Sequence, residues 1–176
     1  NGVVRYAQTR YLRPSPGGPK FDNPSTSMGS NPRLAWTTPT GDDRRPGTLI
    51  VCEGIPDALT AAQYGFRAAG ILGSQYPDHS VATRLATYAE REDLTIVAVI
   101  DGDNAGRNFG QRLGELIAES GIDLQIIEPP TPGHDLNDWA RESPDWADWI
   151  APAIPIDRTI DLRDHEPTTT LEVTTP

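Results

Sequence analysis

The sequence contains one cysteine, one lysine and no long apolar run, and each of these absences excludes a class of protein. Cys52 alone cannot form an intrachain disulfide or a cysteine-based zinc site, and the three scattered histidines do not supply one. Lys20 is not followed by a helical pattern, which excludes a Walker A phosphate-binding loop. No segment approaches about 18 consecutive apolar residues and no charged-then-apolar leader opens the chain, so we expect no membrane span, no secretory signal and a cytoplasmic location.

Charge is distributed unevenly along the 176 residues. Residues 1–47 carry seven basic and three acidic side chains, whereas residues 48–156 carry six basic and 17 acidic ones. Such a division attracts nucleic acid at one place and repels it at another. The length leaves room for one domain with additional segments at its ends. Because the chain begins with Asn1, we expect it to be a segment of a longer protein.

Composition divides the sequence into three parts. Residues 1–47 mix short β-prone runs with turns rich in Pro and Gly, which predicts a small basic subdomain that contains a β-hairpin. Residues 48–150 alternate apolar runs with amphipathic helical patterns and are expected to form the main domain. Residues 151–176 are rich in Pro, Thr and charge, which is typical of a disordered tail or linker.

The main domain is predicted to be α/β with a mainly parallel sheet. Its apolar runs cover residues 48–52, 68–72, 94–100 and 124–127, and three of them are nearly unbroken, as expected for strands buried on both faces. Helical patterns separate the runs, so we predict a four-stranded sheet with helices on both sides. A further helical stretch is expected over residues 136–150, with its three tryptophans on one packed face.

Acidic residues follow three of the four predicted strands. Glu53 follows the first strand, Asp101 and Asp103 follow the third, and Asp135 lies in the loop after the fourth. The carboxyl ends of parallel strands share one edge, where ligands bind, so we expect these side chains to converge. Gathered carboxylates repel one another unless a cation neutralises them, and oxygen ligands without His or Cys suit Mg²⁺ or Mn²⁺. The alternative is that they are solvated residues that cap helices.

The segments around these acids resemble the Toprim domain, a metal-binding catalytic domain of bacterial primases, phage primase-helicases, topoisomerases and related nucleases. The resemblance is carried by Glu-Gly-Ile-Pro-Asp-Ala-Leu at residues 53–59 and Asp-Gly-Asp-Asn-Ala-Gly-Arg at residues 101–107. Gly-His-Asp-Leu-Asn-Asp-Trp at residues 133–139 is similar to the third acidic motif of phage and mobile-element primases. The resemblance covers about residues 48–140 and implies a Toprim fold, which is Rossmann-like.

The resemblance also implies a role for each matched acid. Glu53, Asp101 and Asp103 are expected to be catalytic, with two Mg²⁺ or Mn²⁺ ions as cofactors. The expected metal ligands are Glu53, Asp57, Asp101, Asp103 and Asp135. Asp57 has a second interpretation, as a favourable charge in the first turn of a helix. Replicative primases usually have Asp-x-Asp at the third motif, so whether Asp138 is a ligand or a helix residue stays open.

The function implied is Mg²⁺-dependent nucleotidyl transfer, namely synthesis of RNA primers on single-stranded DNA during DNA replication. The expected parent is a primase or primase-helicase of a phage, plasmid or mobile element. Its partners would be the DNA template, ribonucleoside triphosphates and a replicative helicase, fused or separate. Arg107 and His134 are expected to contact nucleotide phosphates, and exposure to water is the alternative for both. Phosphodiester cleavage, as in Toprim nucleases and topoisomerases, and a non-catalytic nucleic-acid-binding module are the alternative functions.

Basic side chains alternate with aromatic ones in the N-terminal part. The aromatic residues include Tyr6, Tyr11 and Phe21. We predict that the basic side chains follow the backbone of single-stranded DNA while a ring or two stacks on its bases. The alternative is the solvated surface of a β-hairpin. The predicted nucleic-acid-binding residues are Arg5, Arg10, Arg13, Lys20 and Arg33.

Overall fold

The computed structural model describes residues 6–13, 16–18, 21–23, 31–39, 44–73 and 77–150. The predicted tail, residues 151–176, lies outside these ranges, and so do Arg5 and Lys20. Within the described ranges, no helix is long and apolar enough to cross a lipid bilayer.

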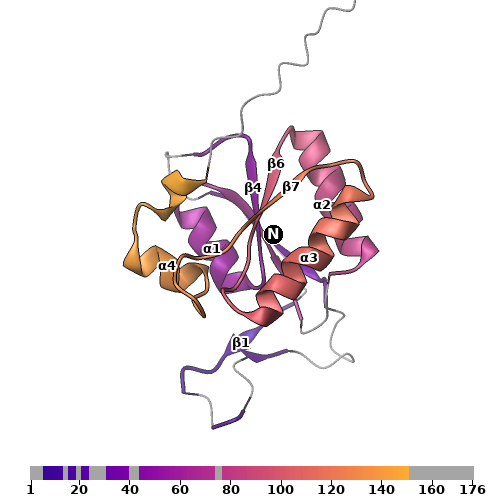
Figure 1. The fold of residues 1–176 in the computed structure, drawn as a ribbon. Helices are drawn as coiled ribbons and strands as arrows, with labels where there is room; N and C mark the ends of the chain where they lie inside the picture. The colour runs from indigo at the N-terminus through magenta and orange to yellow at the C-terminus, as the bar shows by residue number, and fades with distance from the viewer. Residues whose placement is uncertain are drawn as a thin grey trace, which may run out of the picture.

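A five-stranded sheet occupies the centre of the molecule (Figure 1). Its four parallel strands are the four that the apolar runs predict. The fifth is an antiparallel strand at one edge. In spatial order the strands are β3 (Leu34–Thr37), β5 (Arg67–Ile71), β4 (Thr48–Cys52), β6 (Thr95–Val99) and β7 (Leu124–Ile127).

Strand β3 is where the structure differs from the predicted four-stranded sheet. It pairs with β5, with Leu34 opposite Ile71, whereas the composition of residues 1–47 predicts that it belongs to the N-terminal subdomain. A strand of four residues with mixed burial carries no sequence signal for a partner about 30 residues further along the chain. The predicted hairpin is confirmed as a separate antiparallel pair, β1 (Thr9–Arg10) and β2 (Phe21–Asp22).

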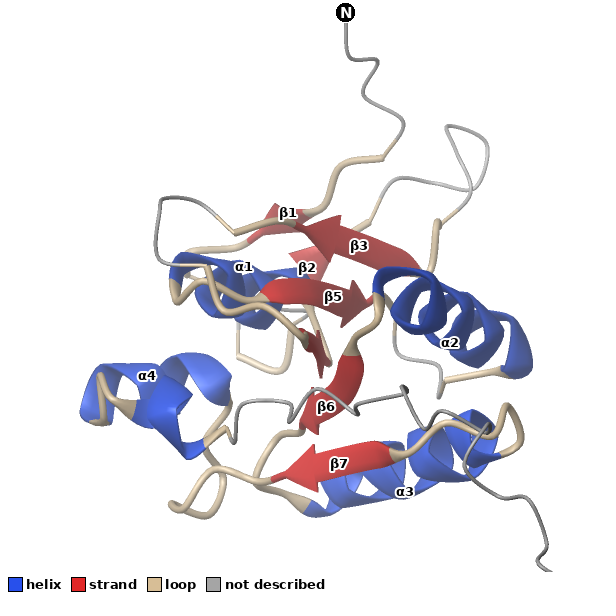
Figure 2. Ribbon diagram, turned by 90° about the horizontal axis from the view of Figure 1, so that it is seen from above, coloured by secondary structure: helices blue, strands red, loops and turns tan. Residues whose placement is uncertain are grey.

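Helices cover both faces of the sheet (Figure 2). Helices α1 (Ile55–Gln63) and α4 (Leu136–Glu142) lie on one face, and α2 (His79–Glu92) and α3 (Asn104–Ala118) lie on the other. Strand β4 supplies alternate residues to the two cores: Leu49 and Val51 pack with α2 and α3, and Ile50 and Cys52 with α1 and α4. This burial on both sides is the reason for the unbroken apolar run.

The stretch expected as one helix over residues 136–150 is divided in two. Helix α4 ends at Glu142, and a 3₁₀ turn, η1 (Trp146–Trp149), follows. Pro144 interrupts the helix because it lacks an N–H and restricts the residue before it. Trp139 and Trp146 are buried with ring centroids 5.7 Å apart, as the packed face predicts, whereas Trp149 is 65% exposed.

Candidate functional site

The ends of β4 and β6 bring the first two acidic motifs together. The strands are parallel neighbours, so Glu53 after β4 and Asp101 after β6 emerge at the same edge of the sheet. The backbone N–H of Asp101 donates a hydrogen bond to Oε1 of Glu53 at 3.2 Å. The convergence expected for these two residues is therefore present.

Two further predicted ligands cap helices at this edge. Asp103 is the N-cap of α3, and its Oδ1 accepts a hydrogen bond from the N–H of Gly106 at 2.8 Å. Asp135 is the N-cap of α4, and its Oδ1 accepts from the N–H of Asp138, also at 2.8 Å. Capping was the structural alternative for these acids, and each capping bond occupies one carboxylate oxygen. The carboxylate of Asp138 itself pairs with Arg141.

Asp57 joins helices α1 and α4. Asp57 is 8% exposed, and its Oδ1 accepts a hydrogen bond from Nδ2 of Asn137. The Oδ1 of Asn137 in turn accepts from the hydroxyl of Thr60. Asp57 therefore does more than favour the helix dipole. The roles of Asn137 and Thr60 have no signal in the sequence, because the pairing of Asn137 with Asp57 spans 80 residues and only the tertiary fold creates it.

Close backbone approach requires glycine at residue 106 and leaves little room for a side chain at residue 102. A Cβ on Gly106 would lie 2.1 Å from the carbonyl oxygen of Asp101, so the start of α3 could not sit against the end of β6. A Cβ on Gly102 would lie 3.0 Å from the nitrogen of Gly133. Gly102 also exchanges two backbone hydrogen bonds with the loop before α4, donating to His134 O and accepting from Gly133 N. This pairing fixes the third acidic segment beside the second.

Burial and mutual repulsion raise the pKa values of two carboxyl groups at this edge. Burial, followed by the charge of Asp101, raises the pKa of Glu53 to about 7, although the hydrogen bond from the backbone of Asp101 opposes the shift. Burial, followed by the charges of Asp135 and Asp101, raises the pKa of Asp57 to about 7. Asp103 adds a smaller repulsion to Glu53. The five acids thus form one electrostatic cluster, here called the acidic edge, that a proton or a cation would stabilise.

The donor set of the acidic edge fits a divalent cation, although the side chains are not gathered around a single point. All five donors are carboxylates, which Mg²⁺ and Mn²⁺ prefer over His or Cys. Among the described residues, no three or more His, Cys, Asp or Glu side chains form a group that could hold a metal ion as placed. Glu53 is in contact with Asp101 through one backbone hydrogen bond, whereas Asp57, Asp103 and Asp135 bond to amide groups. Holding a cation therefore requires some of these side chains to move.

The two residues expected to contact nucleotide phosphates are both beside acids. The guanidinium of Arg107 pairs with Glu128 at 2.6 Å and donates to Oδ1 of Asn104 at 2.8 Å. His134 places Nδ1 3.4 Å from Oε2 of Glu142. Each lies within an acidic motif: Arg107 ends the second motif and lies in α3, and His134 directly precedes Asp135, the N-cap of α4.

Three of the basic residues predicted to bind nucleic acid are described. Arg10 in β1 and Arg13 after it are exposed, as a nucleic-acid contact or a solvated hairpin would both require. Arg33 lies before β3 and pairs with Asp78, the N-cap of α2, at 3.4 Å. Tyr11 donates its hydroxyl hydrogen to Asp22 on the paired strand at 3.3 Å.

Comparison with known proteins decides the family. A Toprim-like family profile matches residues 50–140, which hold all five acids of the acidic edge. This chain belongs to the Toprim-like family. The Toprim resemblance and the α/β fold that it implies are therefore confirmed.

Solved primase structures share the fold of this Toprim-like chain. The zinc-binding and RNA polymerase domains of the Aquifex aeolicus primase superpose with a TM-score of 0.61 at 20% identity, over 83% of this chain and 36% of that one. A DNA primase domain from Pseudomonas aeruginosa superposes with a TM-score of 0.55 at 22% identity, over 78% of this chain and 43% of that one. This chain thus spans less than half the length of either structure. No curated protein matches its sequence.

Proposed function

We propose that this Toprim-like chain carries the nucleotidyl-transfer site of a primase and that its parent protein makes RNA primers on single-stranded DNA with Mg²⁺ or Mn²⁺. The observation that carries the proposal is the hydrogen-bonded contact between Glu53 and Asp101 at the ends of two parallel strands. Membership of the Toprim-like family and a fold shared with two primase structures support it. The proposed parent is a primase or primase-helicase of a phage, plasmid or mobile element, working with a replicative helicase.

Each residue of the acidic edge has a proposed task. Glu53, Asp101 and Asp103 bind the divalent cations, with Asp57 and Asp135 as further ligands. Two cations held by these residues would supply charge stabilisation for the attacking 3′-oxygen and the leaving pyrophosphate of an in-line displacement. As an alternative to binding a cation, Glu53 accepts at Oε1 or Oε2 the proton released by the 3′-hydroxyl. Arg107 and His134 neutralise and orient the triphosphate of the incoming nucleotide.

One observation favours a second candidate, a module that binds nucleic acid without catalysis. In the described residues, no three or more of the carboxylates are assembled into a ready metal site. If that arrangement persists with nucleic acid bound, the chain would recruit a template and perform no transfer. A Toprim nuclease would instead cut the template, and shortening of the template strand would reveal this third possibility.

Primer synthesis by the intact parent protein tests the proposal. Glu53→Gln and Asp103→Asn should each lower synthesis on single-stranded DNA at saturating Mg²⁺ by at least about 100-fold, because each removes a charged oxygen from the acidic edge. Asparagine also caps helices well, so Asp103→Asn should leave the start of α3 in place.

Asp123→Asn is the matched control, because Asp123 is exposed and directly precedes β7. It should retain full synthesis. Wild-type synthesis by Glu53→Gln or Asp103→Asn, with thermal melting unchanged, would contradict the role given to that residue. Metal-independent template binding without any synthesis would favour the non-catalytic module.

A further inference from the structure

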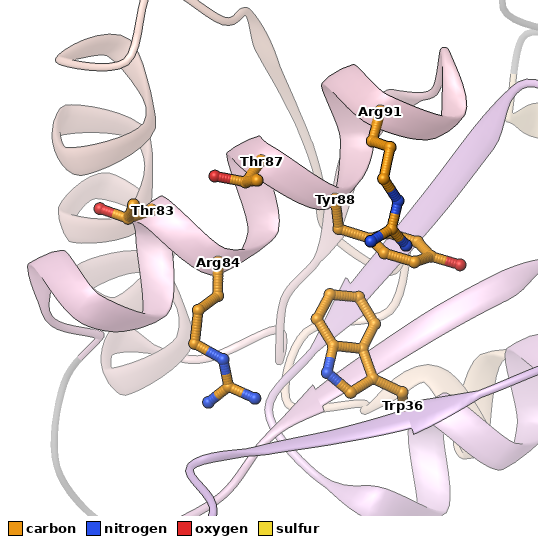
Figure 3. Close-up of a pocket in the computed structure, with 6 residues that line it drawn as sticks. All are labelled: Trp36, Thr83, Arg84, Thr87, Tyr88 and Arg91. Carbon is orange, nitrogen blue, oxygen red and sulfur yellow. The ribbon is translucent and has the colours of Figure 1, made fainter.

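A groove of about 360 Å³ lies between the edge strand β3 and helix α2, and nothing in the proposed reaction uses it (Figure 3). We call it the Trp36 groove. It is lined by Trp36, Thr83, Arg84, Thr87, Tyr88 and Arg91.

The periodicity of α2 gives the groove its side chains. Arg84, Tyr88 and Arg91 follow one another at i, i+4 and i+7 and therefore share one face of the helix. Val81 and Leu85 lie on the buried face and pack in the core. The groove face is thus the part of α2 that the core does not require to be apolar, and it carries two arginines.

Strand β3 supplies the aromatic floor of the groove. Residues two apart in a strand share a face, so Trp36 points to the same side of the sheet as the buried Leu34, the side covered by α2. The Trp36 and Tyr88 rings are 4.5 Å apart, and the Arg91 guanidinium lies 5.2 Å over the Tyr88 ring (Figure 3). Trp36 remains 39% exposed, which leaves ring surface for a planar ligand.

The charge of the side chains that line the groove indicates that it attracts anionic ligands. Residues 48–156 carry only six basic side chains against 17 acidic ones, and two of those six, Arg84 and Arg91, line this groove. No carboxylate lines the groove itself, although Nε of Arg91 pairs with Oε1 of Glu92 at 3.0 Å. The threonine hydroxyls add hydrogen-bond donors. Arg84 also donates to the carbonyl oxygen of Pro32, next to the predicted nucleic-acid-binding residue Arg33, at 2.9 Å. The Arg84 end of the groove therefore lies beside the residues that lead into β3, which include Arg33.

The order of groups along the groove matches a single strand of nucleic acid. Arg84 and Arg91 are seven residues apart, about 10 Å along the helix axis. The Trp36 indole lies between them, so an aromatic surface is flanked by two cations (Figure 3). A strand presents the complementary sequence of phosphate, base and phosphate, and base stacking on aromatic rings tolerates any sequence.

We propose that the Trp36 groove binds single-stranded nucleic acid, with a base stacked on Trp36 and flanking phosphates held by Arg84 and Arg91. This inference deepens the proposed function by naming a surface that guides the template. It does not depend on catalysis, because the groove and the acidic edge are separate sets of residues.

Fluorescence anisotropy with labelled oligothymidine tests the groove on the full chain, in EDTA and across a salt series. Trp36→Leu should weaken binding by about 5- to 150-fold, the range expected for one stacked base. Trp36→Phe should weaken binding less, because an aromatic ring remains. Arg84→Gln and Arg91→Gln should each reduce the log-log salt slope by about 0.7 and the affinity by about fivefold at 0.1 M salt.

Arg112→Gln is the matched control. This substitution removes the same charge, but Arg112 lies on α3 in an ion pair with Glu115. It should retain wild-type affinity and slope. If thermal melting shows that Trp36→Leu is not folded, the proposal is tested with the two exposed arginine variants alone. Wild-type affinity and slope in both arginine variants, or no binding of oligothymidine by the wild-type chain, would overturn the proposal. Binding of polyglutamate that depends on Trp36, without binding of oligothymidine, would assign the groove to an acidic peptide instead.

The outcomes separate this inference from the proposed function. Primer synthesis by the parent protein with a template KM unchanged in Trp36→Leu refutes the groove and leaves the acidic edge intact. Oligothymidine binding that depends on Trp36, in a parent protein that makes no primers, supports the groove and contradicts the proposed function.

Discussion

Replacing Asp57 by asparagine should stabilise this protein at alkaline pH, although the residue belongs to the candidate site. Asp57 is 8% exposed and faces the charges of Asp135 and Asp101, and burial with this repulsion raises its pKa to about 7. Above that pH the folded state contains a buried carboxylate without a cation. Asparagine removes the charge, and its amide oxygen can still accept the hydrogen bond from Asn137.

The sign of the change in unfolding free energy with pH follows from proton binding. An unfolded aspartate titrates near pH 4, so between about pH 4 and pH 7 the folded protein binds more protons at Asp57 than the unfolded chain does. The free energy of unfolding must then fall as the pH rises through that window. A shift of about three pKa units corresponds to at most about 4 kcal/mol above pH 7. Since neighbouring acids share the effect, we expect Asp57→Asn to gain about 1–3 kcal/mol at pH 8 and little at pH 4.

Thermal unfolding in EDTA measures this difference. For a chain of this size, the expected gain at pH 8 raises the Tm of Asp57→Asn by about 2–12 °C over wild type. The gap should shrink as the pH is lowered from 8 towards 4. Exposed Asp123→Asn should show no such dependence. A wild-type protein as stable at pH 8 as at pH 5, together with no gain in Asp57→Asn, would refute the reasoning.

Two other predictions concern backbone approach and the basic hairpin. Gly106→Ala should lower the free energy of unfolding in urea by about 1–3 kcal/mol, because its Cβ would overlap the Asp101 carbonyl. Gly114→Ala on the same helix has room, with the nearest atom 3.7 Å away, and should be neutral or stabilising, so equal losses in the two variants would contradict the steric explanation. Arg10→Gln and Arg13→Gln should each lower the salt slope of oligothymidine binding by about 0.7 if the hairpin follows the template. Unchanged slopes would make it a solvated surface.

The main sheet could be predicted because its strands are buried on both faces. Strand β4 places Ile50 in one core and Val51 in the other, so it is apolar at every position and easy to recognise. The acidic motifs were predictable for a related reason, since parallel strands necessarily end at one edge. Glu53 and Asp101 meet there as expected.

What escaped prediction depends on contacts between distant segments. Strand β3 joins the sheet through its pairing with β5, and its four residues give no sign of that partner. A chain starting at Thr48 would therefore remove a strand of the main sheet, so single substitutions are the sounder test of the N-terminal arginines. The bond between Asn137 and Asp57 and the contact between the tilted rings of Trp36 and Tyr88 likewise require the folded structure.

Calorimetric titration of the full chain with Mn²⁺ tests the central claim, that the acidic edge is a divalent-cation site. The account predicts heat of binding at millimolar Mn²⁺ and a higher Tm, because a cation relieves the repulsion at Glu53 and Asp57 and stabilises the native state that binds it. Both effects should be lost in Asp101→Asn and retained in Asp123→Asn. No heat and no change in Tm for the wild-type chain would contradict the account.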